Sequence, residues 1–115
     1  MLVNEAPQFP VLDESVVEEM KTILEDEYDE LVEEYKVDAQ QLIDQISTAA
    51  EQGDQQSIFA KAHTLGSSSA HMGYMRISKF ARHIEALAKN GAEEDYRALV
   101  VQLNQHYQEL LGILA

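Results

Sequence analysis

A chain of 115 residues with 45% hydrophobic and 25% charged residues has the composition of one globular domain, not of a disordered segment. It contains no cysteine, which excludes disulfides, zinc–thiolate sites, iron–sulfur clusters and a catalytic thiol. Its net charge of −13, from 21 acidic and 8 basic residues, argues against nucleic acids and anionic membrane surfaces as ligands.

Neither a targeting segment nor a membrane-spanning segment is apparent. The first residues, MLVNEAPQFPVLDE, lack the basic stretch and apolar run of a secretory signal. No apolar stretch approaches the roughly 18 residues that a membrane span needs. We therefore expect a cytoplasmic protein.

The first half of the chain is predicted to form two helices after an irregular segment. Residues 1–12 are expected to be irregular because Pro7 and Pro10 interrupt them. Asp13 is a candidate N-cap for a short helix, and a long helix with apolar residues at three- and four-residue intervals follows it. The acidic run EDEYDELVEE, residues 25–34, is better explained by a solvated helix face than by a metal site or a basic partner.

Three further helices are predicted in the second half. Gly53 ends the long helix, Asp54 caps a third helix that stops at Gly73, and a fourth helix stops near Gly91 before the last one begins. No segment alternates with a period of two for long enough to form a strand. The pattern predicts an all-α fold, an antiparallel four-helix bundle with a short extra N-terminal helix, as a single domain over residues 13–115.

The segment AKAHTLGSSSAHMG, residues 60–73, places a histidine beside several of the smallest side chains in the chain. Rotation by about 100° per residue puts His63 roughly 140° from the core stripe of its helix, so His63 should be exposed. Gly66, Ser67 and Ala70 lie at about 80°, 180° and 120° from the same stripe. The core stripe itself consists of Ile58, Ala62, Leu65, Ser69 and Met72.

This run of small residues lowers the stability of a helix. A glycine costs up to about 1 kcal/mol relative to alanine and each serine about half of that, so residues 66–69 cost roughly 2 kcal/mol. The cleared surface could let a partner protein bring its backbone close to His63, or it could be a neutral feature of a tolerant surface. Close helix–helix packing is a third interpretation, although the rotation points Gly66 and Ser67 away from the core.

The segment is similar to the signature of histidine-containing phosphotransfer (HPt) domains, roughly A-H-x-L-K-G-S-S-x-x-(L/M)-G. Six residues fall at the family's positions without a gap, namely His63, Leu65, Ser68, Ser69, Met72 and Gly73. The resemblance extends to the order of the helices over roughly residues 11–115, with the motif on the second helix of the bundle. Gly66 stands where the family usually has a lysine, and Ser67 where it usually has a glycine.

The resemblance implies that His63 accepts a phosphoryl group on Nε2 and exchanges it with an aspartate of a response-regulator receiver domain. Imidazole suits this role because, with an ordinary pKa of about 6.5, much of it is unprotonated at neutral pH. The family often has Gln or Glu 22 residues after the histidine, which gives Glu85 as the acceptor for Nδ1–H; a surface ion pair with Arg82 or Lys89 is the alternative. Lys79 or Arg82 could replace the missing lysine beside the phosphoryl group.

The resemblance also implies a phosphocarrier, not an enzyme with its own kinase activity. The sequence has neither a G-x-x-x-x-G-K-[ST] loop nor a kinase-type glycine loop. The expected partners are a sensor histidine kinase and a receiver domain, and the receiver would supply Mg²⁺ and the catalytic carboxylates. No cofactor is expected on the chain itself, and the expected state is a monomer. The candidate docking residues are Phe59, Gly66, Ser67 and Ala70.

Two other functions compete with this interpretation. A metal-binding bundle is disfavoured because no glutamate has a histidine three residues later, and because His63 and His71 are not spaced as a ligand pair. His71, His83 and His106 are expected to be surface or boundary histidines. The stronger alternative, motivated by the missing lysine, is a degenerate phosphotransfer fold that docks a receiver domain or a kinase without carrying phosphate.

Overall fold

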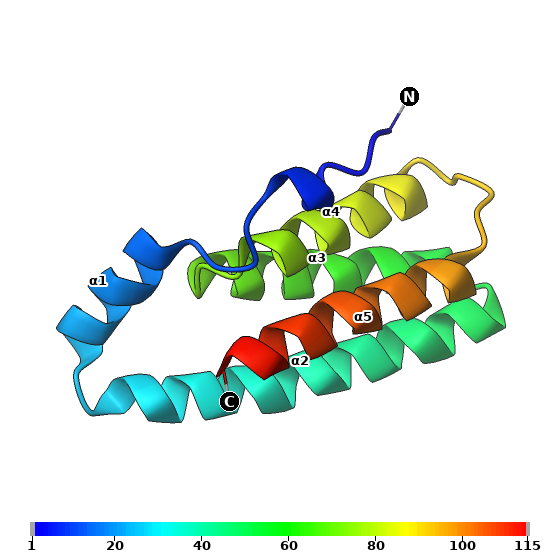
Figure 1. Ribbon diagram of the computed structural model, residues 1–115. Coiled ribbons are helices and arrows are strands. Elements are labelled where there is room, and N and C mark those ends of the chain that lie inside the picture. The colour runs from blue at the N-terminus through cyan, green and yellow to red at the C-terminus, as the bar shows by residue number, and fades with distance from the viewer. Residues whose placement is uncertain (1, 115) are drawn as a thin grey trace.

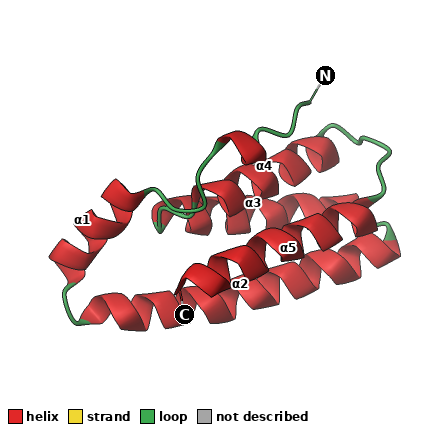
Figure 2. Cartoon of the chain, viewed as in Figure 1, coloured by secondary structure: helices red, strands yellow, loops and turns green. Residues whose placement is uncertain are grey.

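The computed structural model describes residues 2–114. Met1 and Ala115, which belong to the expected segments 1–12 and 13–115, lie outside the described residues. Between residues 2 and 114 all regular elements are helical and no strand occurs (Figure 2). The all-α prediction is therefore confirmed.

Within the described residues the chain forms five α-helices and one short 3-10 helix. They are η1 (Ala6–Gln8), α1 (Glu14–Leu24), α2 (Glu27–Gln52), α3 (Gln55–His71), α4 (Met75–Lys89) and α5 (Tyr96–Leu114). In the bundle, α3 packs between α2 and α4, and α5 closes the other side between the same two helices (Figure 1). Helix α1 lies at one end of the bundle, as the extra helix of the predicted architecture.

The helix boundaries follow from the capping residues. The Asp13 carboxylate accepts hydrogen bonds from the backbone N–H of Ser15 at 3.1 Å, and the Asp54 carboxylate does the same for Ser57 at 3.1 Å. Hydrogen bonds from the serine side chains, followed by those from the backbone, lower the pKa of both carboxyls. Gly53 ends α2 in the left-handed conformation, with a φ of 67°. The caps predicted from the sequence are confirmed.

The N-terminal segment contains one turn of 3-10 helix that the sequence analysis did not predict. Pro7 fits near the start of this turn, where its missing N–H costs nothing. Ala6 is fully buried, and Arg76 on α4 donates from Nε to the Phe9 carbonyl oxygen at 2.9 Å. The segment therefore lies along α4 (Figure 1).

The core stripe of α3 is buried as predicted, and this fixes which face of α3 remains exposed. The five buried residues are Ile58, Ala62, Leu65, Ser69 and Met72. The polar member of the stripe, Ser69, is satisfied by Tyr35 of α2, whose hydroxyl lies 2.7 Å from the serine Oγ. Burial raises the pKa of the Tyr35 hydroxyl, so it stays protonated and able to donate.

Candidate functional site

His63 projects from the middle of α3, away from the buried stripe. Its side chain is 56% exposed, which confirms the exposure predicted from the helical rotation. The ring of Phe59, one turn earlier on the same helix, stacks near the imidazole with the two ring centroids 6.3 Å apart. A partner molecule can therefore reach the imidazole from solvent.

Glu85 on α4 holds the imidazole from one side. Its Oε2 lies 2.8 Å from His63 Nδ1, and the Glu85 side chain is only 17% exposed. A carboxylate accepts hydrogen bonds, so the proton of the neutral ring lies on Nδ1 and the lone pair on Nε2. The alternative ion pairs of Glu85 with Arg82 or Lys89 do not occur among the described side chains.

Gly66 lies in the contact between α3 and α4, not on the surface. The position of a Cβ on Gly66 would be 3.1 Å from Arg82 Cγ and 3.6 Å from the Ser78 carbonyl oxygen. The Ser78 hydroxyl also donates to the Gly66 carbonyl oxygen at 2.8 Å. The prediction that Gly66 lies on an open docking surface is therefore wrong, because α4 covers this side of α3.

The remaining docking candidates share one stripe of α3 with the histidine. Phe59, His63, Ser67 and Ala70 follow one another at three- and four-residue intervals, which places them on one helix face. Ser67 is exposed, and Phe59 and Ala70 are half-buried. Among the small residues, the close-packing interpretation is thus correct for Gly66 but does not apply to exposed Ser67.

The two cation candidates on α4 lie in different environments. Lys79 Nζ lies 4.7 Å from the centroid of the Phe9 ring, so the N-terminal segment engages this ammonium group in a cation–π contact. Arg82 is exposed and its aliphatic stem packs over Gly66. Arg82 also lies one helical turn from Glu85, on the side of α4 that faces His63.

Ser78, which was not predicted from the sequence, links α4 to α3 beside the site. Ser78 is almost fully buried, and its hydroxyl is satisfied by a hydrogen bond to the Gly66 carbonyl oxygen of α3. Ser78 and Ala81 are small residues three apart on α4, and both lie against Gly66. A search for matching small residues on two adjacent helices could have found this contact.

The other histidines lie outside this site. His71 is exposed, whereas His83 and His106 are half-buried and lie near the Phe80 ring at centroid distances of 6.2 Å and 4.9 Å. Burial lowers the pKa of both half-buried imidazoles. Within residues 2–114 no group of three or more His, Asp or Glu side chains is placed to hold a metal ion.

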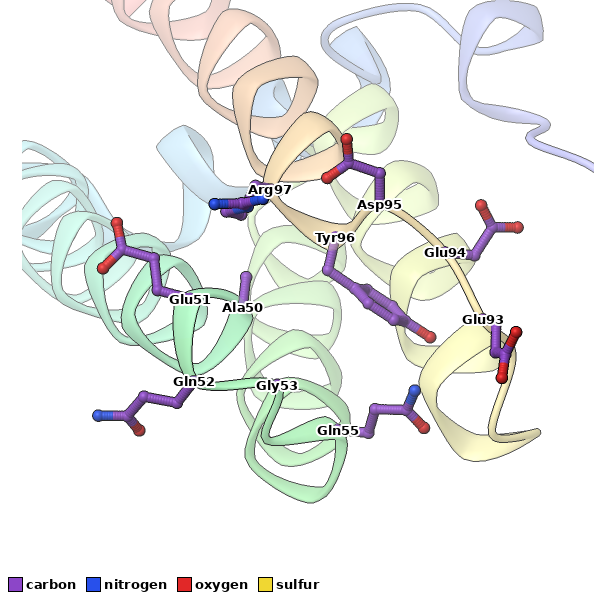
Figure 3. Close-up of a pocket in the computed structure, with 10 residues that line it drawn as sticks. All are labelled: Ala50, Glu51, Gln52, Gly53, Gln55, Glu93, Glu94, Asp95, Tyr96 and Arg97. Atoms are coloured by element: carbon purple, nitrogen blue, oxygen red, sulfur yellow. The ribbon is translucent and has the colours of Figure 1, made fainter.

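An open hollow lies at one end of the bundle, between the α2–α3 turn and the start of α5. Figure 3 shows the Tyr96 ring beside Gln55 in this hollow, with acidic side chains around them. Tyr96 and Gln55 both donate to the Ala92 carbonyl oxygen, at 2.8 Å and 3.2 Å, so these two side chains hold the α4–α5 loop. The residues that line the hollow do not include His63 or Glu85.

Comparison with known proteins assigns the fold to a family. The family model of the Hpt domain matches residues 30–112, which is most of the chain. The chain belongs to the Hpt domain family. It is similar to the crystal structure of histidine-containing phosphotransfer protein B (HptB) from Pseudomonas aeruginosa PAO1, with a TM-score of 0.85 and 25% sequence identity over 88% of each chain. Among curated proteins, no sequence matches this chain.

Membership of the Hpt domain family gives the chain a histidine phosphotransfer role in two-component phosphorelays. Hpt domains are phosphocarriers that interact with histidine kinases and receiver domains. The match begins within α2, so η1 and α1 precede the matched part of this Hpt domain. No helix between residues 2 and 114 is long and apolar enough to cross a membrane.

Proposed function

We propose that His63 accepts a phosphoryl group on Nε2 and exchanges it with an aspartate of a receiver domain. The proposal rests above all on the 2.8 Å contact between His63 Nδ1 and Glu85 Oε2. This contact leaves the nucleophilic lone pair on Nε2, while the imidazole remains 56% exposed. Glu85 is thus the proposed ring-orienting residue and His63 the proposed phosphoacceptor.

The transfer step balances without a proton leaving the ring. The Nε2 lone pair attacks phosphorus, the N–P bond forms, and the bond between phosphorus and the aspartyl oxygen breaks, so the partner's carboxylate leaves as an anion. The phosphorylated ring keeps its Nδ1 proton and gains a positive charge. The Glu85 carboxylate stabilises that charge, as carboxylates do in other histidine–carboxylate pairs.

A cation beside the phosphoryl group would take the place of the family's lysine. Of the two candidates, Arg82 is supported by its exposure and by its position over Gly66, whereas Lys79 is engaged by the Phe9 ring. We therefore assign the neutralising role to Arg82.

The proposed partner docks on the stripe of α3 that contains the histidine. Ser67 and Ala70 have small side chains, so a partner's backbone can approach Nε2 closely on their side of the imidazole, and the half-buried Phe59 ring offers an apolar contact on the other. A receiver domain is the proposed partner for exchange and a sensor histidine kinase the proposed source of phosphate. The receiver supplies Mg²⁺ and the catalytic carboxylates, and the chain acts as a cytoplasmic, monomeric carrier without kinase activity.

Transfer of labelled phosphoryl groups tests this proposal. A panel of phosphorylated receiver domains is mixed with the unaltered chain, with His63→Gln and with His71→Gln, which alters another exposed histidine of α3. We expect acid-labile, alkali-stable label on the unaltered chain and on His71→Gln, and none on His63→Gln. Circular dichroism checks that all three proteins fold. Binding of a receiver without label on any of them would refute the carrier role and favour the degenerate docking module.

A further inference from the structure

The corner between α1 and α2 is built without the residue that usually forms such a corner. Glu25 has a φ of 50° and a ψ of −118°, and it is the one non-glycine residue with a positive φ among residues 2–114. A side chain in this conformation is strained, which is why glycine usually occupies it. The turns after α2, α3 and α4 do use glycines, namely Gly53, Gly73 and Gly91. The bend at Glu25 is therefore a strained part of the backbone.

The local sequence favours a continuous helix across this corner. Neither glycine nor proline occurs between positions 11 and 52. Among the described residues, Asp26 before α2 makes no side-chain capping hydrogen bond, whereas Asp13 and Asp54 cap α1 and α3. No local signal therefore makes α2 begin at Glu27 instead of continuing from α1.

The apolar stripes of α1 and α2 are also in phase with one another. At 100° per residue, one helix over residues 14–52 would carry the members of both stripes within about 60° of a single line. All of these members are buried or half-buried in the bundle. At three- and four-residue intervals they are Val17, Met20, Leu24, Tyr28, Leu31, Tyr35, Ala39, Leu42, Ile46 and Ala49. A stripe that runs in phase through residues 25 and 26 is the pattern of one long helix.

Helix α1 contacts few parts of the bundle. Of the described helices it packs closely only with α2, the next one along the chain. It also meets the α3–α4 turn, where the Asp13 N–H donates to the Gly73 carbonyl oxygen at 2.7 Å and Val16 fits against Gly73. Figure 1 shows α1 at the end of the bundle, beside this turn. Helix α1 can therefore leave as a unit while α3, α4 and α5 stay packed.

A straight helix over residues 14–52 would uncover two apolar surfaces. It would be about 58 Å long, whereas the longest extent of the bent molecule is 44 Å. It would thus carry α1 beyond the end of the bundle and expose Val17, which is only 7% exposed in the bent form. The place that α1 leaves on the bundle would be uncovered as well. A second copy in the same state has the same two surfaces, and each surface fits the other.

We infer that the chain has a second form, a dimer in which residues 14–52 make one helix and the α1 of each copy takes the place of the other copy's α1. The occupant of the vacated place is thus a second copy of this chain. Such an exchange restores the contacts of α1, releases the strain at Glu25 and adds helical hydrogen bonds at the corner. His63 and Glu85 lie outside the exchanged helix, so the inference does not depend on the proposed function.

Charge sets the conditions under which this dimer forms. The acidic run at residues 25–34 begins at the corner, and each chain has a net charge of −13. Because each long helix would join the two bundles, the dimer brings the two acidic corners close together. Their repulsion favours the monomer at low salt, but near 1 M salt the Debye length is about 3 Å and the repulsion is screened. We therefore expect the dimer at high salt and at millimolar protein concentration.

Replacement of Glu25 by glycine tests the corner, with Glu34→Gly as the matched control. Glu25→Gly removes the strain of the bent form and weakens the straight helix, whereas Glu34→Gly removes the same charge from an exposed position that is helical in both forms. We expect Glu25→Gly to raise the dimer dissociation constant roughly 10- to 100-fold, since each dimer contains two corners, and Glu34→Gly to change it less than about threefold. Sedimentation equilibrium in high salt measures the constants, and circular dichroism checks the folding of both variants.

Isotope-filtered NMR of the unaltered chain tests the exchange itself. A dimer is formed from equal amounts of ¹³C-labelled and unlabelled chains, and nuclear Overhauser effects between the two kinds of chain are recorded. The Val16 methyl groups and the Gly73 α-protons should give such an effect between chains, because Val16 lies against Gly73 wherever α1 is docked. In the monomer the same contact stays within one chain.

Three results would overturn the inference. The first is a chain that remains monomeric at millimolar concentration in 1 M salt, where charge repulsion is screened. The second is a dimer in which the contact between Val16 and Gly73 is found only within one chain, because the copies would then associate without exchange. The third is an equal change of the dissociation constant in Glu25→Gly and Glu34→Gly, because the corner would then have no special part in dimerisation.

Discussion

At the scale of single residues, the site consists of an exposed nucleophile and a shielded carboxylate. The His63 imidazole is available to solvent, while Glu85 is mostly covered and reaches Nδ1 at 2.8 Å. A partly covered carboxylate makes a stronger charge-assisted hydrogen bond than a fully solvated one. The orientation of the imidazole should therefore depend on Glu85, which leads to a test of this residue.

Replacement of Glu85 should separate its hydrogen bond from its charge. Glu85→Gln keeps an oxygen that accepts from Nδ1–H, so we expect phosphoryl transfer to slow by less than about tenfold, whereas Glu85→Ala should slow it by about 10- to 100-fold. Single-turnover label transfer measures the rates, and ¹⁵N chemical shifts of the imidazole report which nitrogen of His63 carries the proton. Equal rates and an unchanged tautomer in Glu85→Ala would contradict the orienting role.

Gly66 and Arg82 should act on transfer as a unit. Arg82→Ala should slow phosphoryl transfer about tenfold, or roughly 1.4 kcal/mol, if Arg82 neutralises the phosphoryl charge. Gly66→Ala should slow it too, because the new methyl group would lie 3.1 Å from Arg82 Cγ and displace that side chain. The double variant should be no slower than Arg82→Ala alone, since both changes act through the same guanidinium group.

Gly112→Ala is the matched control for Gly66→Ala. Both glycines lie inside helices, but a Cβ on Gly112 meets no atom within 4 Å. Either substitution gains up to about 1 kcal/mol of helix propensity, so the control should be stabilised without any change in transfer. Additive effects of Gly66→Ala and Arg82→Ala on the rate would contradict the proposed coupling.

At the scale of helices, the turn between α3 and α4 joins the site helices to α1. Gly73 in this turn has a φ of 82°, and its carbonyl oxygen accepts from the backbone N–H of Asp13 at 2.7 Å. Its missing side chain also makes room for Val16, whose Cβ and Cγ1 would lie 3.0 Å from a Cβ on Gly73. A glycine is needed here both for its backbone conformation and for its small size.

These two requirements can be separated by comparison with Gly53. Gly53 also has a positive φ, 67°, but a Cβ there would meet nothing within 4 Å. Gly53→Ala should cost about 1–2 kcal/mol of unfolding free energy from the backbone conformation alone, and Gly73→Ala should cost clearly more because it also pushes Val16 and α1 away. Urea denaturation measures both values. An equal loss of unfolding free energy in the two variants would show that α1 moves away from Gly73 without any loss of stability.

At the scale of the whole molecule, the half-buried histidines make folding stability depend on pH. His83 and His106 both lie near the Phe80 ring, and burial lowers the pKa of both below the ordinary value. For His106, the nearby Glu109 opposes this shift and the nearby Arg76 adds to it. The folded state thus binds protons on these rings less readily than the unfolded state does.

Stability should therefore fall as the pH is lowered through the histidine range. The contribution of His83 and His106 is fully present above their ordinary pKa of about 6.5 and is lost as the pH falls through their depressed values. Urea midpoints measured between pH 7.5 and pH 5 should decline, and the decline should be smaller in a His83→Gln, His106→Gln double variant. A decline of equal size in the double variant would assign the pH dependence to other groups.

The sequence by itself determined the helices, their caps and the exposed histidine. These features depend on neighbours along the chain: Asp13 and Asp54 cap the residues that directly follow them, and the 3.6-residue period places His63 opposite the buried stripe. The 22-residue interval to Glu85, taken from the family resemblance, was matched by the observed contact. Local geometry was sufficient for each of these predictions.

Only the tertiary structure decided which residues of other helices lie next to the stripe of α3 that contains His63. Gly66 lies about 80° around the helix from the core stripe of α3. The rotation alone therefore does not predict its burial, which occurs because α4 packs against that side of α3. The Ser78 hydrogen bond and the engagement of Lys79 by Phe9 likewise join residues that are 12 and 70 positions apart in sequence. Helical periodicity gives the direction of a side chain but not the neighbouring helix that meets it, so these contacts become visible only when the bundle is assembled.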